Sequence, residues 1–268
     1  MNAGVSVGPQ RAGERRTADG DVRVVSLADR PGLVASIPDV LASRWPMFML
    51  AGRPGHDVDL VELVMRTPVH QVVLLDAADE VLGAGLSVPL DWDGTTEGLP
   101  AGWDGAVQAS ADLLARGGTP NTACALSITL KPTAAGRGYA SSMINALKRA
   151  AATAGASALI APVRPVLKTR YPLTPTADYL TWRTDEGEVF DPWLRLHLGL
   201  GGTVRGVAYP SMTITGSIAE WRSWVGLALP GSGEYVIPGG IAPLVVDRVA
   251  DTGVYREPNV WVVHDTES

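Results

Sequence analysis

The stretch LKPTAAGRGYA, residues 130–140, decides the fold, because it joins an apolar strand to a helix through a turn of small residues. The apolar residues before it predict the strand, and residues 139–154 carry apolar side chains at helical spacing. Gly136 and Gly138 let the backbone approach a ligand without Cβ clashes. The first N–H groups and the dipole of such a helix attract an anion, and Arg137 can pair directly with phosphate. The stretch therefore predicts a diphosphate-binding cradle.

The same turn has three other interpretations. A dinucleotide site needs an acid near the end of the next strand to hold a ribose, but that strand ends APVR at residues 161–164, without a carboxylate. A P-loop needs Gly-Lys-Ser or Gly-Lys-Thr, which does not follow. The third interpretation, a tight turn whose glycines serve packing alone, is not excluded at this point.

The periodicity of the rest of the chain predicts the elements around this turn. A strand at 158–163 follows the helix, so two parallel neighbouring strands are expected. The other predicted elements, in chain order, are a strand at 22–27, two short helices within 33–50, a helix at 57–65, a hairpin of strands at 71–76 and 81–88, a helix at 106–114, a helix from Asp191 to residue 197, strands at 203–208 and 211–215, a helix at 218–225, and strands at 235–237, 244–246 and 259–264. This order predicts a mixed α/β (α+β) fold, with a central mixed sheet flanked by helices.

A known family motif is similar to this turn. The run Leu130-x-Pro132-x-x-x-Gly136-x-Gly138-x-Ala140 resembles the acyl-CoA-binding motif of the GNAT acyltransferase superfamily, V-x-P-x-x-R-G-x-G-I-G/A. Leu130 stands for the valine and Tyr139 for the isoleucine. The departure is Ala135, where Gln or Arg is usual; that position gives its backbone amide to the diphosphate. The resemblance extends to the order of elements and implies a GNAT-like fold.

The resemblance also implies how the chain is divided. We expect residues 1–20 to be a flexible N-terminal tail and residues 21–268 to be a single GNAT-like catalytic domain. Within it, the core covers about 21–215, and residues 216–268 form a C-terminal extension. The loop at 92–103 is an insertion relative to a compact core, and we expect it to shape the acceptor site or a partner surface.

The resemblance implies an N-acyltransferase that moves an acyl group directly from a thioester to an amine in a ternary complex. The implied donor is acetyl-CoA or another acyl-CoA; an acyl-phosphopantetheine on an acyl carrier protein is the alternative, because the motif contacts only the arm and its phosphate. A non-catalytic CoA-binding module is the alternative from another class. The implied donor-binding residues are Ile128 and Leu130 on the strand, and Ala135, Gly136, Arg137, Gly138, Tyr139 and Ala140 in the turn.

The same chemistry needs an acid for the departing thiolate and a base for the amine. Tyr171 and Tyr179 follow the strand at 158–163, roughly where the resemblance places a tyrosine acid, and we rank Tyr171 first. Glu257 and His197 are the candidates for base or amine ligand, and each has a structural alternative, a solvated turn acid and a satisfied interior histidine. Asp191 and His264 are further candidates, and Asp191 is better explained as a helix cap.

Composition limits the partners. The formal net charge of −6 and a sequence pI of about 5.2 argue against binding to nucleic acid or an anionic membrane surface. The single cysteine and the four histidines have no metal-ligand spacing, so no metal site is expected. We expect a cytoplasmic protein whose acceptor is a small-molecule amine. The identity of the acceptor and the oligomeric state are not readable from the sequence.

Overall fold

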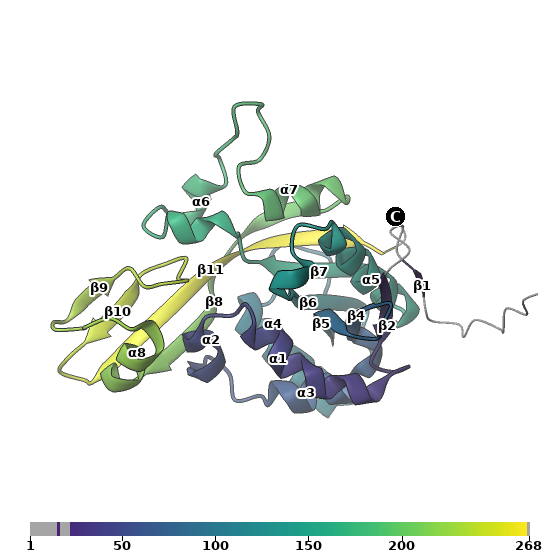
Figure 1. Cartoon of the computed structure of the whole chain (residues 1–268), viewed down its shortest axis with the longest axis horizontal. Coiled ribbons are helices and arrows are strands. Elements are labelled where there is room, and N and C mark those ends of the chain that lie inside the picture. Colours follow the sequence, from purple (N-terminus) through teal and green to yellow (C-terminus); the bar gives the residue numbers. More distant parts are fainter. Residues whose placement is uncertain (1–14, 17–21, 267–268) are drawn as a thin grey trace, which may run out of the picture.

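The computed structural model describes residues 15–16 and 22–266 (Figure 1). The tail predicted at residues 1–20 therefore lies outside the described residues, apart from Arg15–Arg16, whose backbone forms strand β1 against β2. The strands of the described chain form one mixed sheet of eleven strands. No helix within this part of the chain is long and apolar enough to cross a membrane.

The sheet contains one parallel pair. Its strands after β1 are β2 (Val22–Ser26), β3 (Arg53–Pro54), β4 (Val72–Asp76), β5 (Val81–Leu90), β6 (Thr122–Leu130), β7 (Ala158–Val163), β8 (Thr203–Gly216), β9 (Gly233–Tyr235), β10 (Leu244–Asp247) and β11 (Thr252–Asp265). The order across the sheet is β1-β2-β4-β5-β6-β7-β11-β10-β9, with β8 on the other edge of β11 and β3 on β8. The pair β6–β7 is parallel because helix α5 (Tyr139–Thr153) crosses between the two strands, which confirms the predicted β–turn–α–β unit.

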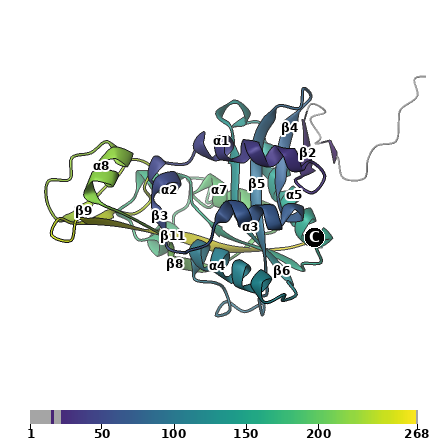
Figure 2. The ribbon, with the colours of Figure 1, turned by 90° about the horizontal axis from the view of Figure 1, so that it is seen from below.

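Helices cover both faces of the sheet (Figures 1 and 2). They are α1 (Ile37–Ala42), α2 (Met47–Ala51), α3 (Leu60–Arg66), α4 (Gly102–Ala115), α5, α6 (Thr176–Tyr179), α7 (Pro192–Gly199) and α8 (Ile218–Val225), with 3-10 turns η1 (Pro31–Ser36), η2 (Pro68–His70), η3 (Pro132–Ala134) and η4 (Leu167–Arg170). Side chains of α1 to α4 form the core on one face, and α5 and α7 cover the other. The mixed α/β fold with a central sheet flanked by helices is therefore confirmed.

Strand β11 lies in the interior, as its alternating side chains predict. Trp261 and Val263 join the core on the α1–α4 face, and Val260 and Val262 pack against Leu194 of α7 on the other face. Because both faces of this central strand are covered, most of its residues are buried, including the polar Glu257, Asn259 and His264.

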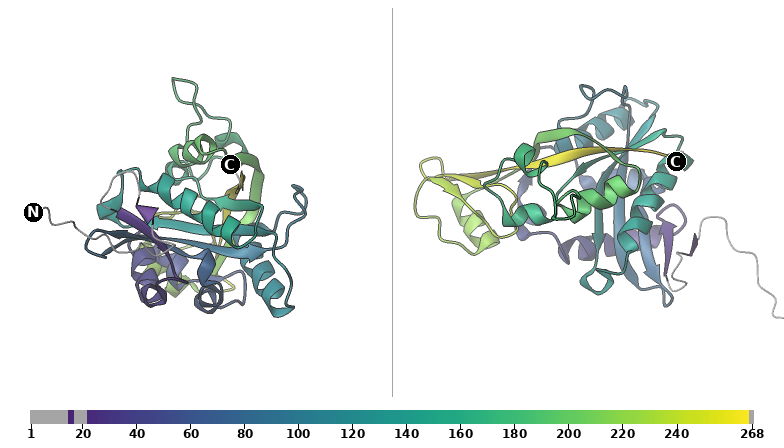
Figure 3. Two further views of the ribbon diagram at one scale, coloured as in Figure 1. Left: turned by 90° about the vertical axis from the view of Figure 1, so that its right-hand side faces the viewer. Right: turned by 90° about the horizontal axis from the view of Figure 1, so that it is seen from above.

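The segment expected as an extension, residues 216–268, supplies this central strand. The C-terminal half of β11 pairs with β7, and its N-terminal half pairs with β10, so β9, β10 and α8 project as an arm from the main body (Figures 1 and 3). The arm is fixed to the body by Trp221, whose indole N–H donates to the Gly253 carbonyl at 2.9 Å and whose ring lies 5.6 Å from Phe48 of α2.

Several element boundaries differ from the prediction, those of β8 and α4 among them. Residues 203–216 form one strand, not two. Pro210 lies where the register between β8 and β11 shifts, so the ladder needs no N–H donor at that position. Helix α4 begins at Gly102, four residues before the apolar period at Ala106 that predicted it, so only Gly102 and Trp103 of the predicted loop at 92–103 are helical.

Candidate active site

The strands β6 and β7 are paired only near their N-terminal ends. Their ladder runs from Thr122 with Ala158 to Cys124 with Ile160. Beyond that point β6 stays paired with β5, and β7 with β11, but no ladder joins β6 to β7 within the described chain. The inner edge of β6 along residues 125–130 can therefore hold an extended ligand by backbone hydrogen bonds.

A β-bulge lies in β6 just after the strands part. The register with β5 shifts so that Leu126 is the extra residue. The indole N–H of Trp103, from α4, donates to the Leu126 carbonyl at 2.9 Å. Ser127 Oγ, the next side chain, is buried and has no hydrogen-bond partner in the described chain. Since a bulge turns backbone groups out of the ladder, this point of β6 can present polar groups to a ligand.

The turn between β6 and α5 has the conformation of an anion cradle. Gly136 and Gly138 both have φ of 76°, a left-handed conformation that favours glycine, and a Cβ at either position would meet no atom within 4 Å. Gly138 is the N-cap of α5, and no side chain caps this N-terminus. The first N–H groups of the helix therefore remain for an anion, with the exposed Arg137 beside them.

The predicted donor-binding residues come together at this end of the sheet. Ile128 and Leu130 pack on the α5 face of β6, and the turn residues 135–140 follow directly. The Leu130 carbonyl accepts a hydrogen bond from Arg44 Nε at 3.1 Å. Helix α5 is held by the buried Met143 and Leu147, so its N-terminus is fixed relative to the edge of β6.

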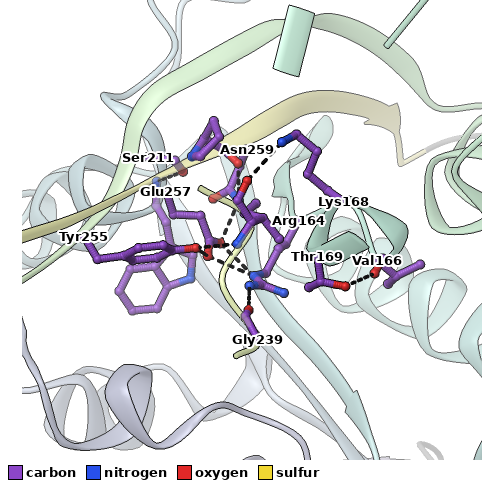
Figure 4. Close-up of polar contacts among 12 residues, drawn as sticks. Arg164, Val166, Lys168, Thr169, Ser211, Gly239, Tyr255, Glu257 and Asn259 are labelled. Atoms are coloured by element: carbon purple, nitrogen blue, oxygen red, sulfur yellow. Dashed lines mark hydrogen bonds and ion pairs between the residues drawn. The ribbon is translucent and has the colours of Figure 1, made fainter. Parts of the chain in front are cut away.

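A buried polar network lies where β7 ends and β11 passes it (Figure 4). Glu257 is 1% exposed, and both of its carboxylate oxygens lie 2.9 Å from Nε of Arg164, the residue after β7. The Tyr255 hydroxyl donates to Glu257 at 2.8 Å, and Asn259 Nδ2 donates to it at 3.1 Å. Arg164 also donates to the Gly239 carbonyl at 2.6 Å, which ties the arm to the end of β7. Glu257 is thus an interior, fully partnered carboxylate and not a solvated turn acid.

The charges of this network are set by its pairing. Burial alone would lower the pKa of Arg164, but the carboxylate of Glu257 and the Tyr255 hydroxyl together outweigh it and raise that pKa above its usual value. Burial raises the pKa of the Tyr255 phenol. At neutral pH the network therefore contains a guanidinium–carboxylate pair and a neutral phenol.

The two predicted tyrosines lie in one aromatic cluster beyond β7. Their ring centroids are 6.2 Å apart, and Trp182 and Phe190 pack against both rings. The hydroxyl of Tyr179 is buried and donates to Asp191 Oδ2 at 2.8 Å, and desolvation raises its pKa. Tyr171 is half-buried, and its hydroxyl makes no hydrogen bond within the described chain. Of the two, Tyr171 has the hydroxyl that a ligand can use.

Asp191 and Lys168 hold the segment that carries these tyrosines. Asp191 Oδ1 caps α7, and its Oδ2 also accepts from the Leu167 N–H at 2.9 Å. Lys168 Nζ donates to the carbonyls of Tyr171 at 2.7 Å and Ile241 at 3.0 Å. Burial lowers the pKa of Lys168 to about 8. Both side chains fix the loop after β7, and Asp191 is the helix cap that its sequence position indicated.

His197 lies away from this group. Its Nδ1 is 2.9 Å from Nε2 of His264, which stands opposite Leu159 at the paired end of β6 and β7. Both rings are buried. Burial, with His264 as the second cause, lowers the pKa of His197 to about 3. The structure therefore does not bring His197 together with Tyr171 and Glu257, and the neutral pair fills the space between α7 and β11.

A cavity of about 590 Å³ opens between α4 and β8. Asp104, on the first turn of α4, contributes to its wall. Its Oδ2 accepts the N–H of Thr213 at 2.7 Å, and the Gly55 N–H is a second backbone donor to this carboxylate. Its Oδ1 is buried and has no hydrogen-bond partner in the described chain. Burial raises the pKa of Asp104 to about 6, against these backbone donors, and the nearby charge of Glu257 adds to the rise.

Sequence reasoning missed three residues of this region: Trp103, Asp104 and Arg164. The loop at 92–103 was expected to shape the acceptor site, but Asp104 lies directly after it, and no spacing separates Asp104 from the acids of that loop. Arg164 follows β7 directly. A cation at the end of a buried strand needs a counter-charge, so its position could have predicted that a buried carboxylate pairs with it. Nowhere in residues 22–266 do three or more His, Cys, Asp or Glu side chains gather in a way that could hold a metal ion.

Known proteins are similar to this chain in sequence and in fold. A search of protein-family models found no match. The arginine N-acetyltransferase avaD of Aspergillus versicolor is 31% identical to this chain, over 88% of this chain and 91% of that protein. Two solved structures share the fold: the loading GNATL domain of CurA from Lyngbya majuscula, with a TM-score of 0.53, 15% identity and coverage of 92% and 98% of the two chains, and the GphF GNAT-like decarboxylase in complex with isobutyryl-CoA, with a TM-score of 0.54, 17% identity and coverage of 91% and 98%.

The fold, and the strand–turn–helix unit with its parting strands, define a GNAT-type enzyme. Because it is 31% identical to avaD over 88% of its length and shares the fold of GNAT-like domains, the chain belongs to the GNAT superfamily of acyltransferases.

Proposed function

We propose that this protein is an N-acyltransferase that moves an acetyl or other acyl group from a CoA thioester to a small-molecule amine, with both substrates bound at once. The observation that carries the proposal is the continuity of two features: the unpaired inner edge of β6 and the uncapped N-terminus of α5. The first fits an extended arm with amide groups, and the second fits the diphosphate at the end of that arm.

The donor is an acyl-CoA in this proposal. Ile128 and Leu130 provide backbone groups for the arm, and residues 135–140 bind the diphosphate, with Arg137 as the direct cation. The GphF domain, which has the same fold, was solved with isobutyryl-CoA. A carrier-protein phosphopantetheine has the same arm and one phosphate, so it is the second donor to test. An enzyme using either donor is expected in the cytoplasm.

The reaction needs two proton movements. The amine nitrogen attacks the thioester carbonyl carbon, the C–N bond forms as the C–S bond breaks, the nitrogen loses a proton, and the thiolate takes one up. We assign the acid role to Tyr171, because its hydroxyl makes no hydrogen bond within residues 22–266, while that of Tyr179 is donated to Asp191. Glu257 is held by Arg164, so in this proposal it fixes the end of β7 beside the acyl group and does not take the proton.

The acceptor is a small amine, and arginine is the first to test because avaD is an arginine N-acetyltransferase. The experiment incubates the protein with acetyl-CoA and a panel of amines, follows free thiol, and identifies the acylated product by mass spectrometry. Thiol release that depends on the amine, with a matching acyl-amine, supports the proposal. Tight CoA binding without thiol release for any amine would instead identify a non-catalytic CoA-binding module.

A further inference from the structure

The cavity between α4 and β8 is built onto the candidate site by fixed contacts. The backbone N–H of Trp103 donates to Ser211 Oγ at 2.9 Å, and the left-handed Gly102 lies so close to Ser211 that no larger residue fits there. The indole of the same Trp103 binds the bulge carbonyl of β6 at Leu126. One residue further along α4, Asp104 faces the cavity. Trp103 therefore links the wall of this cavity to the edge of β6 that fits the donor.

Asp104 has one oxygen more than its structural contacts use. Oδ2 serves the Thr213 N–H, whereas Oδ1 is buried and unpartnered. Leaving a buried carboxylate oxygen without a partner is costly, and because Asp104 lines the cavity, a cationic group bound there would offset that cost. The unpaired oxygen therefore points to a cationic partner that the protein itself does not supply.

The opposite wall of the cavity carries a cation. Arg205, on β8, is exposed and lines the same cavity, and it is the only Lys or Arg among the described lining residues. A carboxylate on one wall and a guanidinium on the other match a molecule with a cationic nitrogen group at one end and a carboxylate at the other. A volume of about 590 Å³ accommodates an amino acid together with water.

We propose that this cavity is the acceptor site, that the acceptor is an amino acid, and that Asp104 binds its cationic nitrogen group while Arg205 binds its carboxylate. The assignment rests on the proposed N-acyltransferase function. It adds the substrate class and two specificity residues, both outside the motif.

The experiment compares arginine with agmatine, its decarboxylated analogue, as acceptors for acetyl-CoA. The variants are Asp104→Asn and Arg205→Gln, with Asp112→Asn, exposed on the same helix, and Arg256→Gln, exposed on β11, as matched controls. Asparagine keeps an oxygen for the Thr213 N–H, so the fold is retained. The readouts are KM and kcat for each acceptor, and calorimetric binding of arginine to the CoA-loaded protein.

We expect Asp104→Asn to raise KM for both acceptors roughly tenfold or more, as for loss of a charge-assisted hydrogen bond. Arg205→Gln should raise KM roughly threefold for arginine and leave agmatine unchanged, because an exposed pair contributes little. An unchanged KM in Asp104→Asn overturns the site, and an equal effect of Arg205→Gln on both acceptors overturns the carboxylate half.

Calorimetry separates this inference from the proposed function. If the wild type transfers no acyl group but binds arginine, and Asp104→Asn abolishes that binding, the site stands and the reaction assignment fails. If the wild type binds neither acceptor, the amino-acid site is wrong whatever the turnover.

Discussion

Replacing Asp104 with asparagine should change how the free energy of unfolding depends on pH. Burial raises the pKa of this carboxyl from 3.8 to about 6 in the folded protein. Between these values the native state keeps a proton that the unfolded chain has lost, so stability falls as pH rises through this window. A difference of about 2 in pKa corresponds to about 3 kcal/mol. Because the side chain is partly exposed and screened by water, we expect about 1–2 kcal/mol.

The assay is urea unfolding of the wild type and Asp104→Asn at about pH 4.5 and about pH 7.5. The free energy of unfolding of the variant, minus that of the wild type, should rise by about 1–2 kcal/mol between these two pH values. Glu257, whose charge adds to the rise in the pKa of Asp104, is present in both proteins, so its contribution largely cancels. Asp112→Asn should show no such rise. A difference that is independent of pH, or that falls with pH, would refute the unpaired, desolvated carboxylate on which the acceptor site rests.

Four further substitutions test the two tyrosines, Glu257 and His197. Tyr171→Phe should lower kcat roughly tenfold or more without weakening CoA binding, whereas Tyr179→Phe loses a buried hydrogen bond and should lower the free energy of unfolding by about 1–2 kcal/mol; unchanged turnover in Tyr171→Phe would exclude it as the acid. Glu257→Gln leaves a guanidinium without its counter-charge and should lower the free energy of unfolding by about 2–4 kcal/mol; a wild-type melting temperature would show that the pair contributes nothing. Burial lowers the pKa of His197 to about 3, so below about pH 6.5 the unfolded chain binds a proton that the native state does not accept, and the free energy of unfolding falls as pH falls. His197→Gln should weaken this loss of stability. The same dependence of the free energy of unfolding on acid pH in both proteins would contradict the prediction.

Local rules were sufficient for the part of the fold around the motif. Gly136 and Gly138 adopt the left-handed conformation that only glycine takes easily, and the helix after them is read directly from its apolar period. Asp191 is placed by the same kind of rule, because a short polar residue before Pro192 is a helix N-cap.

The acceptor side could not be predicted in this way, because long-range contacts place it. Asp104 is positioned by its hydrogen bond with Thr213, and Trp103 by its hydrogen bonds with Ser211 and Leu126. None of these contacts leaves a period or a spacing in the sequence around α4. Glu257 was singled out from its place before a strand, but its partner Arg164 lies 93 residues away, so the sequence did not show that its charge is neutralised.

The most direct test of the central claim is the change in melting temperature caused by CoA. At a concentration about 100 times its Kd, CoA should stabilise the wild type by about 2.7 kcal/mol, or about 5–10 °C for a domain of this size. Gly138→Glu places a carboxylate in the diphosphate seat and should abolish the shift. Gly155→Glu is the matched control, since Gly155 also has a left-handed φ, of 84°, and open space around it, at the other end of α5. A full shift in Gly155→Glu and none in Gly138→Glu is the predicted result, and an equal shift in both variants would place the nucleotide elsewhere and contradict the account.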